Sequence, residues 1–379
     1  MAGIENFDCI VIGAGMAGAS AAAETAGAGL SVLLCEAETQ PGQHATGRSA
    51  ALFTTSYGPP LVRALSRASH AFLATDHPEL DHPLLTRRGA MFVAPPGREA
   101  VARTLATELG PGVALLDAER ARDHLPLLRL SAVACAVLDR TAADVEVASL
   151  HALYLRRLRG AGGRLQTRAE VRAIRHDAGT WIVDTPAGQF RAPLLVNAAG
   201  AWADAVADLA GLPPLGLEPR RRTALLVDPP AGTDPRGWPM AIDIDEHWYV
   251  KPDAGRLLLS PADATPSAPC DAQPEEIDIA IAIDRVQRAL DLPVRRIVQK
   301  WAGLRSFLPD GVPVAGFDDG ARGFFWLAGQ GGYGIQTAPA LARATAALLM
   351  QRPLPADILA EGVTASALDP ARIRAGQIS

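Results

Sequence analysis

The sequence lacks several features that would each define a class of protein. No uninterrupted apolar run among its 379 residues is long enough to cross a bilayer. No basic tract is present, and the formal net charge of −5 argues against a nucleic-acid partner. The first apolar run is preceded by acidic Glu5, not by a basic segment, so we expect no signal peptide. We therefore predict a globular protein without stable membrane insertion.

Cysteine is scarce, and its four copies form no recognisable site. They are Cys9, Cys35, Cys135 and Cys270. None has a metal-type spacing to histidine and none forms a close redox pair, so we expect no bound metal and a reducing, cytoplasmic setting. The eight histidines are scattered, and only His44 and His247 are candidates for a site. The motifs of the serine-hydrolase elbow, the zinc proteases and the P-loop do not occur.

Residues 7–36 are the stretch around which the chain is organised, and they read FDCIVIGAGMAGASAAAETAGAGLSVLLCE. The parts are a short strand at Phe7–Ile12, the glycines Gly13, Gly15 and Gly18, a small-residue helix at Ala17–Ala26, a second strand at Ser31–Cys35, and Glu36. A strand, glycine turn, helix and strand that end in an acid are typical of dinucleotide binding. The alternative is a glycine-rich helix packed for structure alone.

Each residue type in this pattern has a physical reason. Gly13 permits a tight turn, Gly15 lets a pyrophosphate approach the backbone, and Gly18 lets the helix pack on the strand. The N-terminus of the helix presents free N–H groups and a positive dipole end to the phosphates. Glu36 has the spacing expected of the acid that binds ribose hydroxyls. We therefore predict a dinucleotide site at this turn.

A second glycine turn lies far along the chain. An apolar strand at Phe324–Leu327 leads through GQGGYGIQT into a helix at Ile335–Met350. Like the first turn, it directs N–H groups and a positive dipole end at an anionic group. Because a reduced flavin is anionic at its pyrimidine ring, this turn is suited to the far end of a flavin dinucleotide.

The segments between the two turns alternate strands and helices without an internal repeat. We expect the hydroxyl-rich loop 37–58 to lie over the cofactor and to contain a short helix from Gly47. The alternative is an ordinary surface connection. A helix over residues 144–159 would have Asp144 as its capping residue.

Two later segments complete the expected fold. Leu194–Asn197 runs into an Ala-Ala-Gly turn, and Arg222 precedes an apolar run, so it could begin a strand and point inward. The pattern predicts an α/β chain with a Rossmann-like, doubly wound, mostly parallel sheet. An α+β domain on a mostly antiparallel sheet would be interleaved with it. We assign residues 1–85, 145–218 and 305–379 to the first domain, and 86–144 and 219–304 to the second.

These motifs together resemble a known family. The first turn with Glu36, NAAGAW at 197–202 and WLAGQGGYGIQT at 326–337 resemble the FAD-dependent amino-acid oxidoreductases of the D-amino acid oxidase superfamily. The stretches GQHATGRSAALFTTSYG, PLGLEPRRRTA, YVKPDAG and WAGLRSF resemble most those of bacterial D-arginine dehydrogenases. The resemblance covers nearly the whole chain and implies bound FAD. No cysteine lies near Arg48 or residues 329–336 in the sequence, so we expect the FAD to be non-covalent.

The resemblance also implies roles for individual residues. Arg222, Tyr249 and Arg305 would bind the substrate carboxylate, a role suited to paired guanidinium bonds and a tyrosine hydroxyl. Further substrate-site residues would be Tyr57 on a mobile gating loop, flanked by Thr54, with Met240 and Ile242 in the side-chain pocket and Gly332 and Gln336 near the substrate amine and flavin. FAD would be held by Gly13, Gly15, Met16, Ala17, Gly18, Glu36, Ala37, Arg48, Ser49, Ala50, Val171, Ala199, Gly200, Trp202, Gly331, Gly332, Tyr333, Gly334, Ile335, Gln336 and Thr337.

Two positions depart from the pattern of D-arginine dehydrogenases. Leu52 stands where those enzymes have a histidine, and Ala90 where they have the glutamate that pairs with the substrate guanidinium. A guanidinium buried beside these side chains would lack a partner, at a cost of several kcal/mol. We therefore expect D-arginine to be a poor substrate and neutral side chains to be preferred, unless another acid such as Glu246 supplies the charge.

The reaction that the resemblance implies is oxidative deamination of a D-amino acid. Hydride would pass from the α-carbon to flavin N5, and the imino acid would hydrolyse to a 2-keto acid and ammonia. One alternative is a related flavoenzyme oxidising glycine, sarcosine, another secondary amine or a 2-hydroxy acid, because a carboxylate clamp suits all of these. The others are an NAD-dependent dehydrogenase and a non-catalytic flavin-bearing protein. The electron acceptor (oxygen, a quinone or another) and the oligomeric state, a monomer or an assembly, are left open.

Overall fold

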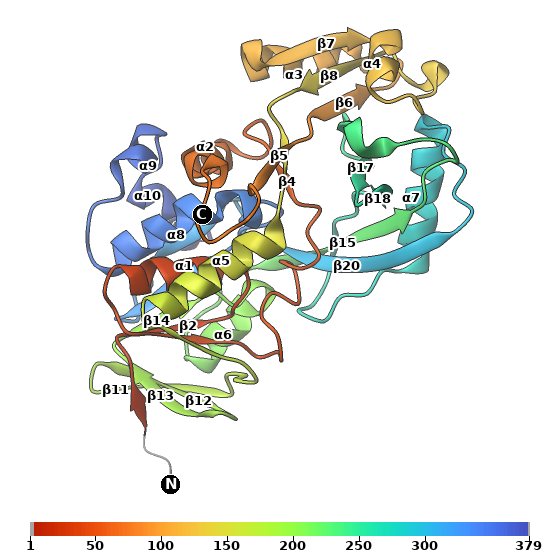
Figure 1. Ribbon diagram of the computed structural model, residues 1–379. Helices are drawn as coiled ribbons and strands as arrows, with labels where there is room; N and C mark the ends of the chain where they lie inside the picture. The colour runs from red at the N-terminus through yellow and green to blue at the C-terminus, as the bar shows by residue number, and fades with distance from the viewer. Residues whose placement is uncertain (1–3, 378–379) are drawn as a thin grey trace.

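A six-stranded sheet forms the centre of one half of the computed structural model, which describes residues 4–377 (Figure 1). In order across the sheet, its strands are β10 (Arg164–Gln166), β3 (Val32–Cys35), β2 (Cys9–Ile12), β14 (Leu194–Asn197), β22 (Phe324–Ala328) and β21 (Val314–Phe317). All neighbouring pairs are parallel except β22 and β21. The chain moves outward from β2 in both directions, which confirms the predicted doubly wound, mostly parallel sheet.

The two faces of this sheet are buried by different partners. Because side chains alternate along a strand, Val11 and Leu34 face one layer while Ile10 and Leu33 face the other. The first layer consists of the helices α1 (Met16–Gly27), α5 (Val147–Gly160), α8 (Gly334–Leu349) and, against α8, α2 (Pro60–Ala74). The second layer is a four-stranded sheet of β1 (Glu5–Asn6), β13 (Gly188–Ala192), β12 (Thr180–Thr185) and β11 (Ala173–Asp177).

The other half of the molecule is built on a nine-stranded sheet. Its strands are, in order, β19 (Thr265–Pro266), β15 (Glu218–Val227), β18 (Arg256–Ser260), β17 (Tyr249–Asp253), β16 (Met240–Asp243), β6 (Ala90–Ala94), β8 (Cys135–Asp139) and β7 (Val113–Asp117), with β20 (Ile297–Phe307) paired to β15. Only the pair β16 and β6 is parallel. Its helices are α3 (Glu99–Leu109), α4 (Ala118–His124) and α7 (Glu276–Ala289). The predicted mostly antiparallel sheet is thus confirmed.

The two halves are interleaved along the chain, as the sequence predicts. Figure 1 shows β15 and β20 running side by side from one half toward the other. The remaining elements are a small sheet of β4 (Leu52–Phe53), β9 (Ala143–Val145) and β5 (Leu85–Arg87), and the helices α6 (Ala203–Leu209), α9 (Ala356–Ala360), α10 (Ala365–Leu368) and α11 (Ala371–Gln377). We propose that the domain boundaries assigned from the sequence follow this division.

The expected helix from Gly47 is wrong. Residues 41–48 form a series of turns, in which the Gly47 N–H donates to the Gly42 carbonyl at 2.8 Å. The Trp301 indole N–H donates to the Arg48 carbonyl at 3.2 Å, so the backbone is held from outside by β20. These tertiary contacts replace the helical hydrogen bonds that the local pattern favours.

Asp144 is not a helix cap, which is a second correction. It lies in β9, and α5 begins three residues later with Glu146 as its capping residue. One Asp144 carboxylate oxygen accepts from Lys251 at 3.0 Å, and the other accepts from the Arg88 Nε at 2.7 Å. The three side chains are at most 16% exposed. They join β9 to β17 through a mostly buried cluster of charges.

The cysteines and the helices agree with the limits that composition set. The four cysteines are free, and burial raises the pKa of Cys9 and Cys35 to about 12. Among residues 4–377, no helix combines the length and the apolar character that a bilayer span requires.

We expect Asp144→Ala to lower the free energy of unfolding by about 3–5 kcal/mol, because it leaves two buried cations without their shared anion. Urea denaturation followed by circular dichroism measures the change.

The matched control is Asp234→Ala, which removes an equally charged partner of Arg236 at the surface, where both side chains are more than half exposed. Its effect should stay within about 0.5 kcal/mol. Equal effects of the two substitutions would contradict the assignment of Asp144 as a buried junction.

Candidate functional site

A cavity of about 540 Å³ lies at the carboxyl-end edge of the parallel sheet. Because β2, β3, β14 and β22 are parallel, the segments that follow them all emerge at this edge, where doubly wound sheets bind ligands. The cavity is lined by both glycine turns, by residues 35–38 after β3 and by residues 198–202 after β14. It continues along the paired strands β15 and β20, so the two halves of the molecule share it.

The first glycine turn has no room for side chains. Gly13 has a φ of +98°, and a Cβ there would lie 2.5 Å from the Ala198 carbonyl oxygen. A Cβ on Gly18 would lie 1.8 Å from the Gly13 carbonyl oxygen. Gly15 lines the cavity, and the backbone N–H of the next residue, Met16, donates to Thr46 at 2.9 Å. The turn therefore brings bare backbone to the cavity wall.

Glu36 lies at the end of β3 and is 8% exposed. One carboxylate oxygen accepts from the Ala14 N–H and the other from the Glu38 N–H, both at 2.9 Å. A carboxylate has about four acceptor positions, so two remain for ribose hydroxyls. Glu36 thus fixes the glycine turn and faces the cavity at once.

The structure gathers most of the sequence-predicted cofactor residues around this one cavity. Those that line it are Gly13, Gly15, Met16, Ala17, Glu36, Ala37, Arg48, Ser49, Ala50, Val171, Ala199, Gly200, Trp202, Gly331, Gly332, Gly334 and Ile335. Gly18, Tyr333, Gln336 and Thr337 lie outside the lining. Gln336 and Thr337 are buried in α8, and Gly18 is buried in α1.

Three polar residues in the lining were missed as cofactor residues. His44 Nε2 lies 2.9 Å from Glu38, and its ring lies 4.8 Å from that of Trp202. Within the described chain, His44 Nδ1 and the side-chain amide nitrogen of Gln330 are buried without a hydrogen-bond partner. Polar atoms of this kind, beside a bare backbone turn, fit a bound dinucleotide. The sequence analysis assigns none of them to FAD individually, although Gln330 lies in the second glycine turn and His44, a candidate for a site, lies with Glu38 in the loop expected over the cofactor.

The cavity is also lined by Cys270, which corrects the expectation that no cysteine lies near Arg48. Arg48 donates to the Ala272 and Ala302 carbonyls at 2.9 and 2.8 Å and pairs with Asp271. These contacts draw the loop that carries Cys270 against the cavity. The sequence separation of more than 200 residues concealed this neighbour.

Two arginines face the same cavity from neighbouring strands. Arg222 lies in β15 and Arg305 in β20, and Tyr249 from β17 lines the cavity with them. The Arg222 guanidinium lies 6.0 Å from the centre of the Tyr249 ring, and its Nε donates to the Asp263 carbonyl at 2.6 Å. Burial, and then the like charge of Arg305, lower the pKa of Arg222.

Neither guanidinium has an anion of its own. In the part of the chain that the structure describes, no carboxylate lies within ion-pair distance of Arg222 or Arg305. Arg305 is held against the second glycine turn, since a Cβ on Gly332 would lie 2.9 Å from its guanidinium carbon. Two positive charges without an ion pair at one cavity favour an anionic ligand.

Tyr57 lies close to this pair of arginines. Its hydroxyl donates to Glu246 at 2.9 Å, and its ring lies 5.4 Å from that of Tyr333. Burial raises the pKa of Tyr57, so the hydroxyl stays protonated at neutral pH and acts as a donor. Thr54, three residues earlier, is 3% exposed.

The sequence-predicted pocket residues form an apolar layer behind Tyr249. Met240, Ile242 and Leu52 pack in one cluster with Tyr249, but none of them lines the cavity itself. Ala90 lies opposite Met240 in the sheet and is fully buried. The acid opposite Ala90 in the sheet is Asp139, whose two oxygens already accept hydrogen bonds from Thr54, Ser56 and Thr141.

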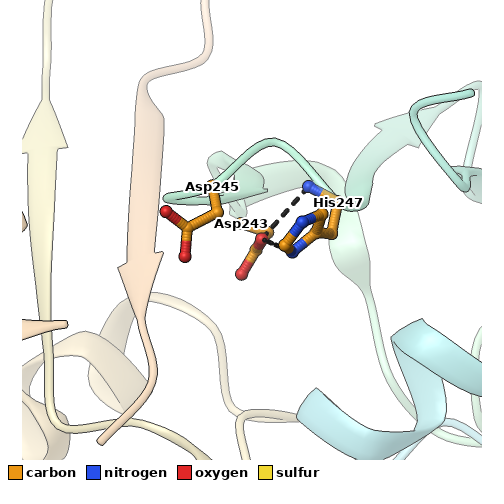
Figure 2. Close-up of side chains that lie close together, drawn as sticks. All are labelled: Asp243, Asp245 and His247. Carbon is orange, nitrogen blue, oxygen red and sulfur yellow. Dashed lines mark hydrogen bonds and ion pairs between the residues drawn. The ribbon is translucent and has the colours of Figure 1, made fainter. Parts of the chain in front are cut away.

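Figure 2 shows a group of possible metal ligands in the turn after β16, Asp243, Asp245 and His247. Asp243 accepts from the backbone N–H of His247 and lies 3.1 Å from its Nδ1, while Asp245 pairs with Arg98. Both carboxylates therefore already have partners, which fix the turn that presents Glu246. His247 lies outside the cavity lining, so we assign no metal here.

The comparisons with known proteins agree with this geometry. Residues 8–348 match the model of the DAO family, described as FAD dependent oxidoreductase. The chain is 26% identical over 240 residues to dimethylglycine dehydrogenase of Mus musculus, an alignment that covers 58% of this chain and 28% of that protein. It is 28% identical over 232 residues to glycine oxidase of Geobacillus kaustophilus, covering 61% and 60%. The chain thus spans less than two thirds of the length of these curated relatives.

Solved structures show the same fold. The crystal structure of glycine oxidase from Geobacillus kaustophilus superposes with a TM-score of 0.80 at 25% identity, covering 92% of this chain and 95% of that one. L-alpha-glycerophosphate oxidase from Mycoplasma pneumoniae, with FAD bound, gives a TM-score of 0.82 at 18% identity and the same coverage, which shows the fold alone. The finer resemblance to D-arginine dehydrogenases is not supported by these relatives. The family model, together with the dinucleotide edge of the cavity, shows that the chain belongs to the DAO family of FAD-dependent oxidoreductases.

Proposed function

We propose that the protein oxidises a small α-amino acid at its carbon–nitrogen bond, with glycine and N-methylated amino acids as the substrate class. The observation that carries the proposal is that Arg222 and Arg305, on the wall of the FAD cavity, form no ion pair with a carboxylate among the described residues. The names of three relatives support the class: dimethylglycine dehydrogenase, glycine oxidase and N-methyl-L-tryptophan oxidase. Each of these names contains an α-amino acid whose nitrogen is free or methylated.

The substrate carboxylate would lie between the two arginines and the Tyr249 hydroxyl. A guanidinium forms two parallel charge-assisted bonds to a carboxylate, and these fix the orientation of the rest of the substrate. The bound anion would also return the lowered pKa of Arg222 toward its ordinary value, because opposite charges stabilise each other.

FAD, when bound, supplies the acceptor for the two electrons and the hydrogen that leave the substrate carbon. The residues of the chain supply orientation and charge. With one carboxylate bound, the two arginines leave a net positive charge, which lowers the pKa of a neighbouring ammonium group. The amine is thereby kept neutral, and its free electron pair is available to the reaction.

The apolar layer behind Tyr249 supports a second candidate, neutral D-amino acids. Leu52, Met240 and Ile242 offer no charge and would accept an N-methyl group or an apolar side chain equally well. D-Arginine should be disfavoured in either case, since Glu246 already accepts the Tyr57 hydrogen bond and Asp139, opposite Ala90, already accepts from Thr54, Ser56 and Thr141.

We expect sarcosine, dimethylglycine, glycine and N-methyl-L-tryptophan to include the best substrate when the purified yellow protein is mixed with each under anaerobic conditions. Bleaching of the visible flavin band measures the reaction. D-Leucine, D-phenylalanine and D-arginine are the comparison set, and D-arginine should be the slowest of these three.

Faster bleaching by D-leucine than by every glycine derivative would replace the first candidate with the second. No bleaching by any member of the panel would overturn the proposal as a whole.

We expect Arg222→Met to lower kcat/KM about 10- to 100-fold on whichever substrate the panel identifies. Hydrogen bonds to charged groups contribute about 1.5–3 kcal/mol, which corresponds to this range. Steady-state kinetics measure the change, and Arg222→Lys should restore only part of it because lysine cannot form the paired bonds.

Arg220→Met is the control, since Arg220 lies in the same strand but outside the cavity lining and pairs with Glu218 at the surface. Its kcat/KM should match that of the unaltered protein. A similar loss in both variants would indicate a general effect on β15 rather than loss of a carboxylate contact.

FAD is proposed to be held non-covalently, although Cys270 lines the cavity. Denaturing the yellow protein in acid should leave the flavin absorbance in the supernatant. Flavin retained by the precipitate of the unaltered protein, and released in Cys270→Ala, would contradict this.

A further inference from the structure

A buried carboxylate outside the cavity holds the loop that carries Tyr57. Asp139 ends β8, does not line the cavity and is 1% exposed. One of its oxygens accepts from the hydroxyls of Thr54 and Ser56 at 3.1 and 2.9 Å. The other accepts from the backbone N–H and the hydroxyl of Thr141 at 2.8 and 2.6 Å. A buried carboxylate that is fully hydrogen-bonded is strongly held in place.

The two residues whose hydroxyls Asp139 binds, Thr54 and Ser56, flank Thr55, and Ser56 immediately precedes Tyr57. Thr54 is also held from the other half of the molecule, because its backbone N–H donates to the Gln336 side chain at 3.2 Å. Gln336 lies in the first turn of α8, directly after the second glycine turn. The loop is therefore fastened to the nine-stranded sheet by Asp139 and to the FAD-binding half by Gln336.

The position of Tyr57 depends on these fastenings. Tyr57 itself is contacted from both halves: its hydroxyl donates to exposed Glu246 in the half built on the nine-stranded sheet, and its ring lies on Tyr333 of the second glycine turn. A single bond to an exposed carboxylate contributes little by itself. The hydrogen bonds that Asp139 accepts lie around a buried carboxylate, where water does not compete for them.

We propose that Asp139 is a positioning residue that keeps Tyr57 near Arg222 and Arg305 by binding Thr54 and Ser56. The role in catalysis rests on the proposed function, whereas the fastening of the loop does not. Asp139 touches neither the cavity nor the arginines, and it acts only through the loop. If the role of Asp139 were purely structural, it would stabilise β8 and Thr141 as much as the loop. Loss of its carboxylate would then have no particular effect on the loop.

The test compares the two sides of the Asp139 carboxylate. Ser56→Ala removes a donor on the loop side, and Thr141→Val removes a hydroxyl donor on the other side and serves as the matched control. Asp139→Asn keeps the side-chain volume and part of the hydrogen bonding. It serves as a second loop-side variant in case the loop of Ser56→Ala adopts another conformation. Hydrogen exchange of residues 50–58 measures the fastening, and binding of benzoate, followed by the flavin absorbance, measures the site.

Exchange in residues 50–58 should be about tenfold faster in Ser56→Ala and Asp139→Asn and unchanged in Thr141→Val. Benzoate should bind more weakly in the same two variants, and KM should rise with kcat nearly unchanged. In combination with Tyr57→Phe, the effect of Ser56→Ala on benzoate binding should largely disappear, because both act through one side chain.

Unchanged hydrogen exchange of residues 50–58 in both Ser56→Ala and Asp139→Asn would overturn the inference. It would also be overturned if exchange in the Thr141→Val control were as fast as in those two variants. Faster exchange with unaltered benzoate binding would also overturn it, since Tyr57 would then not depend on the anchor. If benzoate fails to bind the unaltered protein, the proposed carboxylate site is wrong, and the exchange comparison still decides whether Asp139 holds the loop.

Discussion

The architecture of the site depends on one steric constraint, the contact between bare backbone at Gly13 and the turn after β14. A side chain on Gly13 would collide with the Ala198 carbonyl, and one on Gly18 would collide with Gly13 itself. Because these atoms are absent, β2, α1 and β14 meet at one edge with N–H groups directed outward. Glu36 then completes the edge by accepting from the backbone of the same turn.

Charge determines what the rest of the cavity can bind. Arg222 and Arg305 lie on paired antiparallel strands, and neither forms an ion pair with an acid of the described residues 4–377. An anionic ligand would relieve this repulsion, which is why we propose that an amino-acid carboxylate binds here. Behind Tyr249 the wall is apolar, so discrimination among neutral substrates rests on shape and contributes less than the charge.

The two halves of the molecule are joined at the cavity by more than covalent connections. The loop before Tyr57 receives a hydrogen bond acceptor from each half, Asp139 from one and Gln336 from the other. Arg305 likewise reaches from β20 to Gly332 of the second glycine turn. Movement of one half relative to the other would therefore change the substrate site and the cofactor site together.

The sequence by itself determined the parts of the protein that rest on short-range patterns. The strand–glycine–helix turn, the second glycine turn, the bounds of β14 and the mostly parallel class of the first sheet follow from periodicity and from residues with few conformational options. The tertiary structure decided the rest. It placed Asp144 between Lys251 and Arg88 instead of at a helix end, kept the residues from Gly47 onward out of a helix, and brought Cys270 and Asp139 to the site or its supports. Each of these outcomes depends on a partner many residues away, and hydrogen bonds of that kind leave no periodic signal in the chain.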